Sequence, residues 1–222
     1  MKFAFLMTGC ERTFEYCFPS IQKWVLEPYK PDMFICMDTA KESRFRDLYN
    51  PVAMHVVSPE ERQQAIGDTP NRFSQYKAPE AVISHNVAAL YQHKTVWKLF
   101  KQYGKHYDVV FIGRPDVEIY HLNHDFNVPL KPDTYYEPYQ DALGTVQSNG
   151  IYYGGWGGQL AFGTERVAEV FCSTYDNMEH LYTEYKDWHT ERMWRHQFQE
   201  HNIGVATFDI DFKIIRTWQI PD

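Results

Sequence analysis

The chain has 222 residues, a net charge of −7, 44% hydrophobic side chains and 17% aromatic ones. This length fits one large α/β domain or a domain with a C-terminal extension, and the lack of a basic run argues against a nucleic-acid-binding groove. No stretch approaches the roughly 20 apolar residues of a transmembrane helix. The cysteines have neither metal-ligand nor disulfide spacing, which favours a reducing, cytoplasmic setting; they are Cys10, Cys17, Cys36 and Cys172.

Apolar runs alternate with helical periodicity in the first half of the chain. Apolar runs predict strands at residues 2–8, 32–37, 52–57 and 107–112. The first and the last of these runs are typical of parallel strands that are buried on both faces. Apolar spacing predicts helices around residues 18–25, from residue 58 and over 79–103, with the polar, proline-containing residues 67–79 as a loop. This order indicates an α/β fold with a mostly parallel central sheet flanked by helices.

The pattern changes after Glu118. Residues 120–150 show no clear period, and the glycine-rich residues 150–159 either approach a ligand closely or form a bulged aromatic hairpin. Helices are expected over 164–185 and 190–201, followed by two short strands at 205–210 and 212–215. The aromatic excess is typical both of a filled core and of sites for sugar-like ligands.

Two carboxylates, Asp116 and Glu118, follow the apolar run at 107–112. Open α/β sheets bind ligands beyond the carboxyl ends of their strands, and hard divalent cations prefer oxygen ligands. We therefore expect Asp116 and Glu118 to be metal ligands. The alternative is a solvated turn whose acidic side chains cap the next element.

Four segments together resemble the GT-A-type glycosyltransferases, which transfer sugars from nucleotide sugars. They are Thr8-Gly9-Cys10-Glu11-Arg12 after the first strand, Asp38 after the second, Arg114-Pro115-Asp116 at the place of the family's DxD motif, and Gly154-Gly155-Trp156-Gly157-Gly158 before Trp188-His189-Thr190-Glu191-Arg192. The Arg-Pro-Asp variant is similar to a subset of bacterial and viral polysaccharide glycosyltransferases. The resemblance implies a single GT-A-like (Rossmann-like) domain over residues 1–222, with a small C-terminal β-ribbon on the acceptor side.

The resemblance divides the chain by function. Residues 1–119 would bind a nucleotide-diphosphate sugar of the UDP or GDP type, and residues 120–222 would bind a glycan or lipid-linked acceptor, which could bring the enzyme to a membrane. The implied nucleotide contacts are Thr8, Gly9, Arg12, Asp38, Lys94 and Arg114. The implied acceptor contacts are Trp156, Gly157, Gly158 and Trp188. For Lys94, a stem that reaches solvent from the buried stripe of its helix is the alternative to a phosphate contact.

Arg114 departs from the family pattern, because it stands in place of the first acid of DxD. We expect Asp116 still to bind Mn²⁺ or Mg²⁺, with help from Glu118 or from a late histidine. The alternative is that Arg114 itself offsets the diphosphate charge, since its planar fork suits phosphate. The late histidines are His189, His196 and His201.

Glu191 is the expected general base that takes the proton of the acceptor hydroxyl, with Asp187 in reserve. An acid in the first turn of a helix also complements the helix dipole, and Arg195 four residues later could pair with Glu191. Both interpretations remain open, and a retaining mechanism would need no such base.

Two other functions are compatible with the sequence. A nucleotidyltransferase that makes nucleotide sugars normally has a glycine-rich loop after its first strand, and residues 8–12 contain one glycine. A non-catalytic protein that binds glycans or nucleotides would also fit the aromatic excess and the altered DxD motif.

Overall fold

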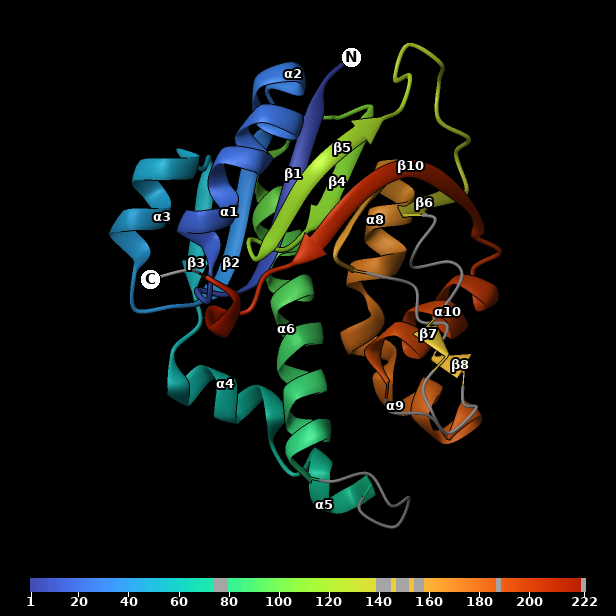
Figure 1. Ribbon diagram of the computed structural model, residues 1–222. Helices are drawn as coiled ribbons and strands as arrows, with labels where there is room; N and C mark the ends of the chain where they lie inside the picture. Colours follow the sequence, from blue (N-terminus) through green and yellow to red (C-terminus); the bar gives the residue numbers. More distant parts are fainter. Residues whose placement is uncertain (74–79, 139–144, 147–151, 154–157, 187–188, 221–222) are drawn as a thin grey trace.

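The structure is a computed structural model that describes residues 1–73, 80–138, 145–146, 152–153, 158–186 and 189–220. A central sheet of eight strands has the order β3-β2-β1-β4-β9-β6-β10-β5 (Figure 1). Its strands are β1 (Phe3–Cys10), β2 (Asp32–Asp38), β3 (Ala53–Val56), β4 (Val109–Gly113), β5 (Val117–Asn123), β6 (Thr134–Pro138), β9 (Leu160–Gly163) and β10 (Gly204–Ile214). A separate two-stranded ribbon pairs β7 (Thr145–Val146) with β8 (Tyr152–Tyr153).

The first half of the sheet is parallel and the second half is mixed. Strands β3, β2, β1 and β4 run parallel, whereas β9 is antiparallel to both β4 and β6. Strand β10 pairs parallel with β6 and antiparallel with β5. The predicted α/β fold with a mostly parallel sheet is confirmed.

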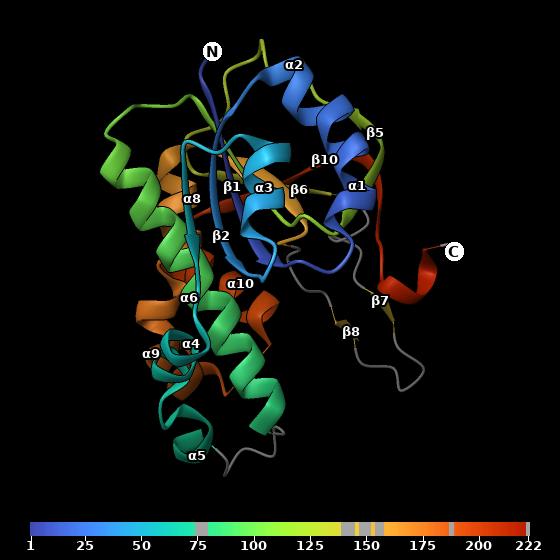
Figure 2. The same ribbon diagram turned by 90° about the vertical axis from the view of Figure 1, so that its left-hand side faces the viewer.

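Helices cover both faces of this sheet. In Figure 2, α1 and α3 lie on one side of β1 and β2, and α6 and α8 lie on the other. The helices are α1 (Phe14–Ile21), α2 (Glu27–Tyr29), α3 (Glu42–Tyr49), α4 (Pro59–Ile66), α5 (Thr69–Phe73), α6 (Glu80–Tyr103), α8 (Glu165–Cys172), α9 (Thr174–Tyr185) and α10 (Thr190–Glu200). A π-helical segment, Gln22–Leu26, joins α1 to α2.

Side-chain alternation along the strands builds two separate cores. On β1, Ala4 and Leu6 pack with α6 and α8, whereas Phe5 and Met7 pack with α1 and α3. The same alternation on β2 and β4 follows from the two-residue period of a strand. Both faces are therefore apolar, which explains the continuous hydrophobic runs in the sequence.

Several sequence predictions need correction. Helix α3 was not predicted, because Phe45 and Tyr49 are its only buried side chains and too few to set a period. The expected loop at 67–79 contains α5, and β5 and β6 lie in or overlap the region without a clear period. The helix expected over 164–185 is broken at Ser173 into α8 and α9.

The two closing strands expected near the C-terminus are one strand, β10, within the main sheet. Its pairing with β5 shifts register between Asp211 and Phe212, which is where the two predicted strands were separated. A bulge of this kind interrupts the two-residue alternation without ending the strand. No described helix is long and apolar enough to cross a membrane, and all four cysteines are free thiols.

Gly9 shapes the end of β1. Its φ angle is 136°, a conformation that side chains with a Cβ rarely adopt, and its carbonyl oxygen accepts a hydrogen bond from Gln92 Nε2 at 3.1 Å. We expect Gly9→Ala to lower the free energy of unfolding by about 1–3 kcal/mol, because the alanine must hold a strained backbone.

Gly204→Ala is the matched control for urea unfolding of Gly9→Ala. Gly204 has no positive φ, and an added Cβ would meet its nearest neighbour at an ordinary 3.6 Å. Equal stability losses in the two variants would contradict a special role for the Gly9 conformation.

Candidate active site

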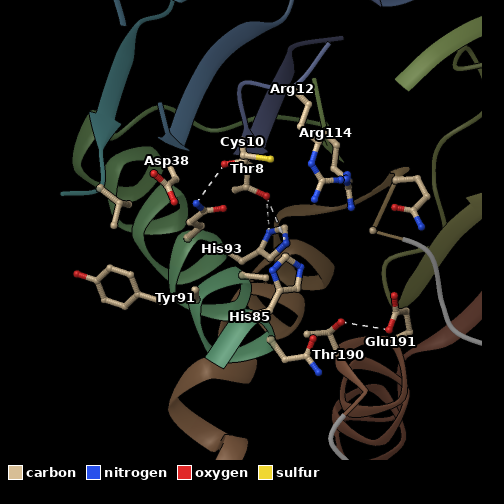
Figure 3. A pocket seen from close by; sticks show the side chains of 18 of the residues that line it. Thr8, Cys10, Arg12, Asp38, His85, Tyr91, His93, Arg114, Thr190 and Glu191 are labelled. Carbon is tan, nitrogen blue, oxygen red and sulfur yellow. Dashed lines mark hydrogen bonds between the residues drawn. The ribbon is translucent and has the colours of Figure 1, made fainter. Parts of the chain in front are cut away.

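A cavity of about 520 Å³ lies where the carboxyl ends of β1, β2 and β4 face helices α6 and α10 (Figure 3). Its volume falls in the range of small-molecule sites, and its place at the strand ends is where open α/β sheets bind ligands. Many of the residues singled out from the sequence line this cavity. They are Thr8, Gly9, Arg12, Asp38, Arg114, Gly158, His189 and Glu191.

Arg12 and Arg114 come together because their strands are hydrogen-bonded neighbours. Strands β1 and β4 pair in parallel from Phe3 with Val109 to Met7 with Gly113. Arg114 directly follows β4 and Arg12 lies two residues beyond β1. Figure 3 shows both guanidinium groups on the strand side of the cavity, with Glu191 on the α10 side.

The carboxylate of Asp116 lies behind these arginines. Its side chain is only 2% exposed, and it accepts a two-pronged hydrogen bond from Arg114, with Nε 2.8 Å from Oδ1 and Nη2 2.7 Å from Oδ2. Arg12 Nη1 lies 3.5 Å and Arg216 Nη1 3.8 Å from Oδ2. One buried carboxylate therefore holds three guanidinium groups, of which Arg114 is the most tightly bound.

Sequence reasoning missed Arg216, which also lines the cavity. Two hydrogen bonds made by the backbone of the preceding residue, Ile215, hold this C-terminal segment next to the site. Ile215 N donates to the Asp116 carbonyl oxygen at 2.9 Å, and Thr13 Oγ1 donates to the Ile215 carbonyl oxygen at 2.8 Å. Arg216 directly follows the strand predicted at 212–215, and a basic residue at the end of a predicted strand was the available signal.

Helix α6 supplies a wall of polar side chains that the sequence analysis also missed. His85, Gln92 and His93 line the cavity, and the Thr8 hydroxyl lies 3.3 Å from the ring nitrogens of His93. His93 lies three residues after Leu90, on the buried stripe of the helix, and a polar residue on such a stripe was the available signal. Arg62, which pairs with Asp38 at 3.0 Å, was missed as well.

The arginines make the cavity electropositive. Burial, and to a lesser degree the charge of Arg114, lowers the pKa of His93 to about 3. Burial also lowers the pKa of His85, followed by the charges of Arg12, Arg114 and Arg62. Both imidazoles are therefore neutral near pH 7, so that the positive charge is concentrated on the arginines.

Glu191 comes from the first turn of α10. It lines the cavity, and one of its oxygens accepts a hydrogen bond from Thr190 Oγ1 at 3.1 Å. Gly158 lines the same cavity and is packed so closely that an added Cβ would lie 2.9 Å from Trp194 Cη2. The expected acceptor residues Trp156, Gly157 and Trp188, and the reserve base Asp187, lie outside the described residues.

Other expected site residues lie elsewhere. Lys94 forms an ion pair with Asp176, its ammonium group lies 5.0 Å from the ring centroid of Tyr175, and it does not line the cavity. Glu118 accepts a hydrogen bond from the Tyr120 hydroxyl at 2.7 Å and does not line the cavity. His196 stacks on Tyr185, with ring centroids 3.7 Å apart, and neither it nor His201 lines the cavity.

The donor set at Asp116 does not fit the expected Mn²⁺ or Mg²⁺. Both carboxylate oxygens already accept hydrogen bonds from Arg114, and Arg12 and Arg216 lie within 4 Å of Oδ2, so a cation would stand among guanidinium groups of the same sign of charge. Among the residues that the structure describes, no group of three or more His, Cys, Asp or Glu side chains could hold a metal ion. Arg114 stands where the DxD motif has its first acid, and it is hydrogen-bonded to Asp116, which stands at the second.

In fold, the chain is similar to the mannosyltransferase Ktr4p from S. cerevisiae, solved in complex with GDP. The TM-score is 0.50 at 11% identity, over 96% of this chain and 71% of that chain. It is also similar to mouse xyloside xylosyltransferase 1 in its apo form, with a TM-score of 0.48 and 9% identity over 94% of this chain and 86% of that chain. No protein-family model and no curated protein sequence matches it. The likeness to Ktr4p is one of fold: both chains share a mixed α/β architecture, which here is a mostly parallel sheet flanked by helices.

The buried His93 gives the protein a pH-dependent stability. Its pKa of about 3 in the folded state is below the roughly 6.5 of an unfolded chain, so the unfolded state binds more protons between these values. We expect the neutral His93 to contribute its full stabilisation above pH 6.5. Below that pH, the free energy of unfolding should fall by up to about 1.4 kcal/mol per pH unit because of this group.

Urea unfolding of wild type and His93→Gln at pH 7.5 and pH 5.0 measures this effect. The difference in unfolding free energy between the two pH values should be smaller in His93→Gln than in wild type. His201→Gln, at an exposed position, should keep the wild-type pH dependence. An unchanged pH dependence in His93→Gln would contradict the assignment.

Proposed function

We propose that this protein is a glycosyltransferase that moves a sugar from a nucleotide-diphosphate donor to a hydroxyl group of a glycan or lipid-linked acceptor. The observation that carries the proposal is one cavity with arginines on its strand side and a carboxylate on its helix side. A transfer with inversion of configuration uses these two charges on opposite sides of the transferred sugar.

The arginine side suits the leaving group. Transfer breaks the bond between the sugar and the diphosphate, and negative charge develops on the departing phosphate oxygen. Arg12 and Arg114 stand at the strand ends, where guanidinium groups can stabilise this charge as it develops. Thr8, Gly9 and Asp38 at the same strand ends complete the proposed nucleotide side, which residues 1–119 provide.

The carboxylate side suits the acceptor. Glu191 lines the cavity opposite the arginines, and one of its oxygens is held by Thr190. As general base it would take the proton of the acceptor hydroxyl while that oxygen attacks the sugar carbon. Gly158 lines the cavity and is proposed as an acceptor contact. Trp156, Gly157 and Trp188 are proposed as further acceptor contacts and lie outside the described residues.

The fold supports this proposal. The similar mannosyltransferase was solved with GDP, a nucleoside diphosphate of the class that we propose here. A GT-A-like fold also hosts nucleotidyltransferases, so the reaction itself has to be tested. The donor is proposed as a UDP or GDP sugar.

Glu191→Gln is the variant that tests the assignment of the base. The amide keeps the shape of the side chain but cannot take a proton, so kcat for transfer should fall by about 10²–10⁴-fold while the affinity for donor stays the same. Glu184→Gln, at an exposed position on α9, is the matched control. Wild-type turnover in Glu191→Gln would remove it as the base.

A panel of nucleotide sugars with glycan and lipid-linked acceptors, read by mass spectrometry, tests the function. We expect a sugar-extended acceptor and a free nucleoside diphosphate from one donor. Release of pyrophosphate from a nucleoside triphosphate would instead indicate a nucleotidyltransferase. Nucleotide binding without transfer or donor hydrolysis would indicate a binding protein.

A further inference from the structure

We infer that Arg12, Arg114 and Arg216 bind the donor diphosphate directly, in place of a divalent cation, and that buried Asp116 positions them. This inference rests on the proposed function and specifies the chemistry of its donor site. It reverses the expected role of Asp116, from metal ligand to partner of the arginines.

The charge balance of the cluster suits a diphosphate. Three guanidinium groups surround one carboxylate, which leaves two positive charges. The diphosphate of a nucleotide sugar carries two negative charges. The other acid on the strand side of the cavity, Asp38, is paired with Arg62. Glu191 lies on the opposite, α10 side of the cavity. The lowered pKa of His85 keeps its imidazole neutral, so it adds no further positive charge to the two of the cluster.

The arginines keep hydrogen-bond donors for a ligand. A guanidinium group has five N–H donors, and Asp116 takes one from Arg114 Nε and one from Nη2. Arg12 Nη1 and Arg216 Nη1 lie 3.5 and 3.8 Å from Asp116 Oδ2, farther than the two hydrogen-bonded nitrogens of Arg114. The remaining donors suit phosphate oxygens, which the planar fork of arginine binds in pairs.

The exposure of these four side chains shows which of them can contact a ligand in the cavity. Asp116 is 2% exposed and does not line the cavity, whereas the side chains of Arg12, Arg114 and Arg216 are 28–40% exposed and do line it. The carboxylate therefore lies behind the guanidinium groups, on the side away from the ligand. Asp116 is accordingly a positioning residue, because it acts on the diphosphate through the arginines.

The backbone around Asp116 joins the three segments that carry the arginines. Asp116 itself lies two residues after Arg114, and its carbonyl oxygen accepts a hydrogen bond from Ile215 N. Ile215 in turn accepts from Thr13, one residue after Arg12. Side chain and backbone contacts thus set the same three segments in place before a ligand arrives, which reduces the ordering cost of binding.

Isothermal titration calorimetry with UDP, GDP and inorganic pyrophosphate tests the inference, once in EDTA and once in Mn²⁺. For the nucleotide that binds, we expect dissociation constants within threefold of each other in the two conditions. Arg216→Ala and Arg12→Ala should each weaken binding at least tenfold. Arg166→Ala is the matched control, because Arg166 is exposed and pairs with Asp133 away from the cavity, and it should bind as wild type does.

Asp116→Asn tests whether Asp116 acts by positioning the arginines or only through its own negative charge. Removing a negative charge beside a bound diphosphate should tighten binding if only charge matters, whereas loss of arginine positioning should weaken it tenfold or more. Arg216→Lys keeps the positive charge but lacks the planar guanidinium group, so it should also weaken binding. This second variant tests the inference if Asp116→Asn does not fold. Tighter binding by Asp116→Asn would overturn the positioning role.

The outcomes distinguish this inference from the function on which it rests. Binding of UDP or GDP that requires Mn²⁺ and is lost in Asp116→Asn would overturn the inference and leave the proposed function standing. Binding in EDTA that the Arg12 and Arg216 variants do not weaken would also overturn it. No binding of either nucleotide in either condition would overturn both.

Discussion

The carboxylate of Asp116 is the group on which the rest of the site depends. It is buried, it takes both of its hydrogen-bonded contacts from Arg114, and it lies within 4 Å of Arg12 and Arg216. A buried carboxylate without such partners would be strongly unfavourable, and so would three neighbouring guanidinium groups without a carboxylate. The acid and the arginines therefore require each other, and together they produce an electropositive wall in the cavity.

The order of the strands is what brings these groups together. Strands β1 and β4 are neighbours, so the segments after them place Arg12 and Arg114 side by side. Strand β10 pairs with β5, the strand that begins just after Asp116, so its end delivers Arg216 to the same point. The first turn of α10 lies across the cavity with Glu191, and this opposition of charges follows from the topology (Figure 3).

Much of this arrangement could be predicted from the sequence, because doubly buried strands have continuous apolar runs and site residues follow them. The strand before Arg114 and the importance of Asp116 were accessible in this way, and the resemblance to the DxD segment pointed to Arg114. Their mutual pairing was not, since it depends on how the turn through Pro115 folds one side chain onto another. Arg216 is a hundred residues from Asp116 in sequence, and only the strand pairing brings it near. Lys94 was misplaced because a periodic pattern shows that a residue lies near a stripe but not where its long side chain ends.

The crystal structure of the protein with UDP or GDP, grown in EDTA, is the most direct test of this account. We predict a diphosphate in the cavity at the ends of β1 and β4, with its oxygens within hydrogen-bond distance of Arg12, Arg114 and Arg216 and with the pairing of Arg114 and Asp116 intact. A nucleotide bound elsewhere would contradict the assignment of the site. A diphosphate that binds only with a cation on Asp116, and with Arg114 displaced, would contradict the role given to the arginines.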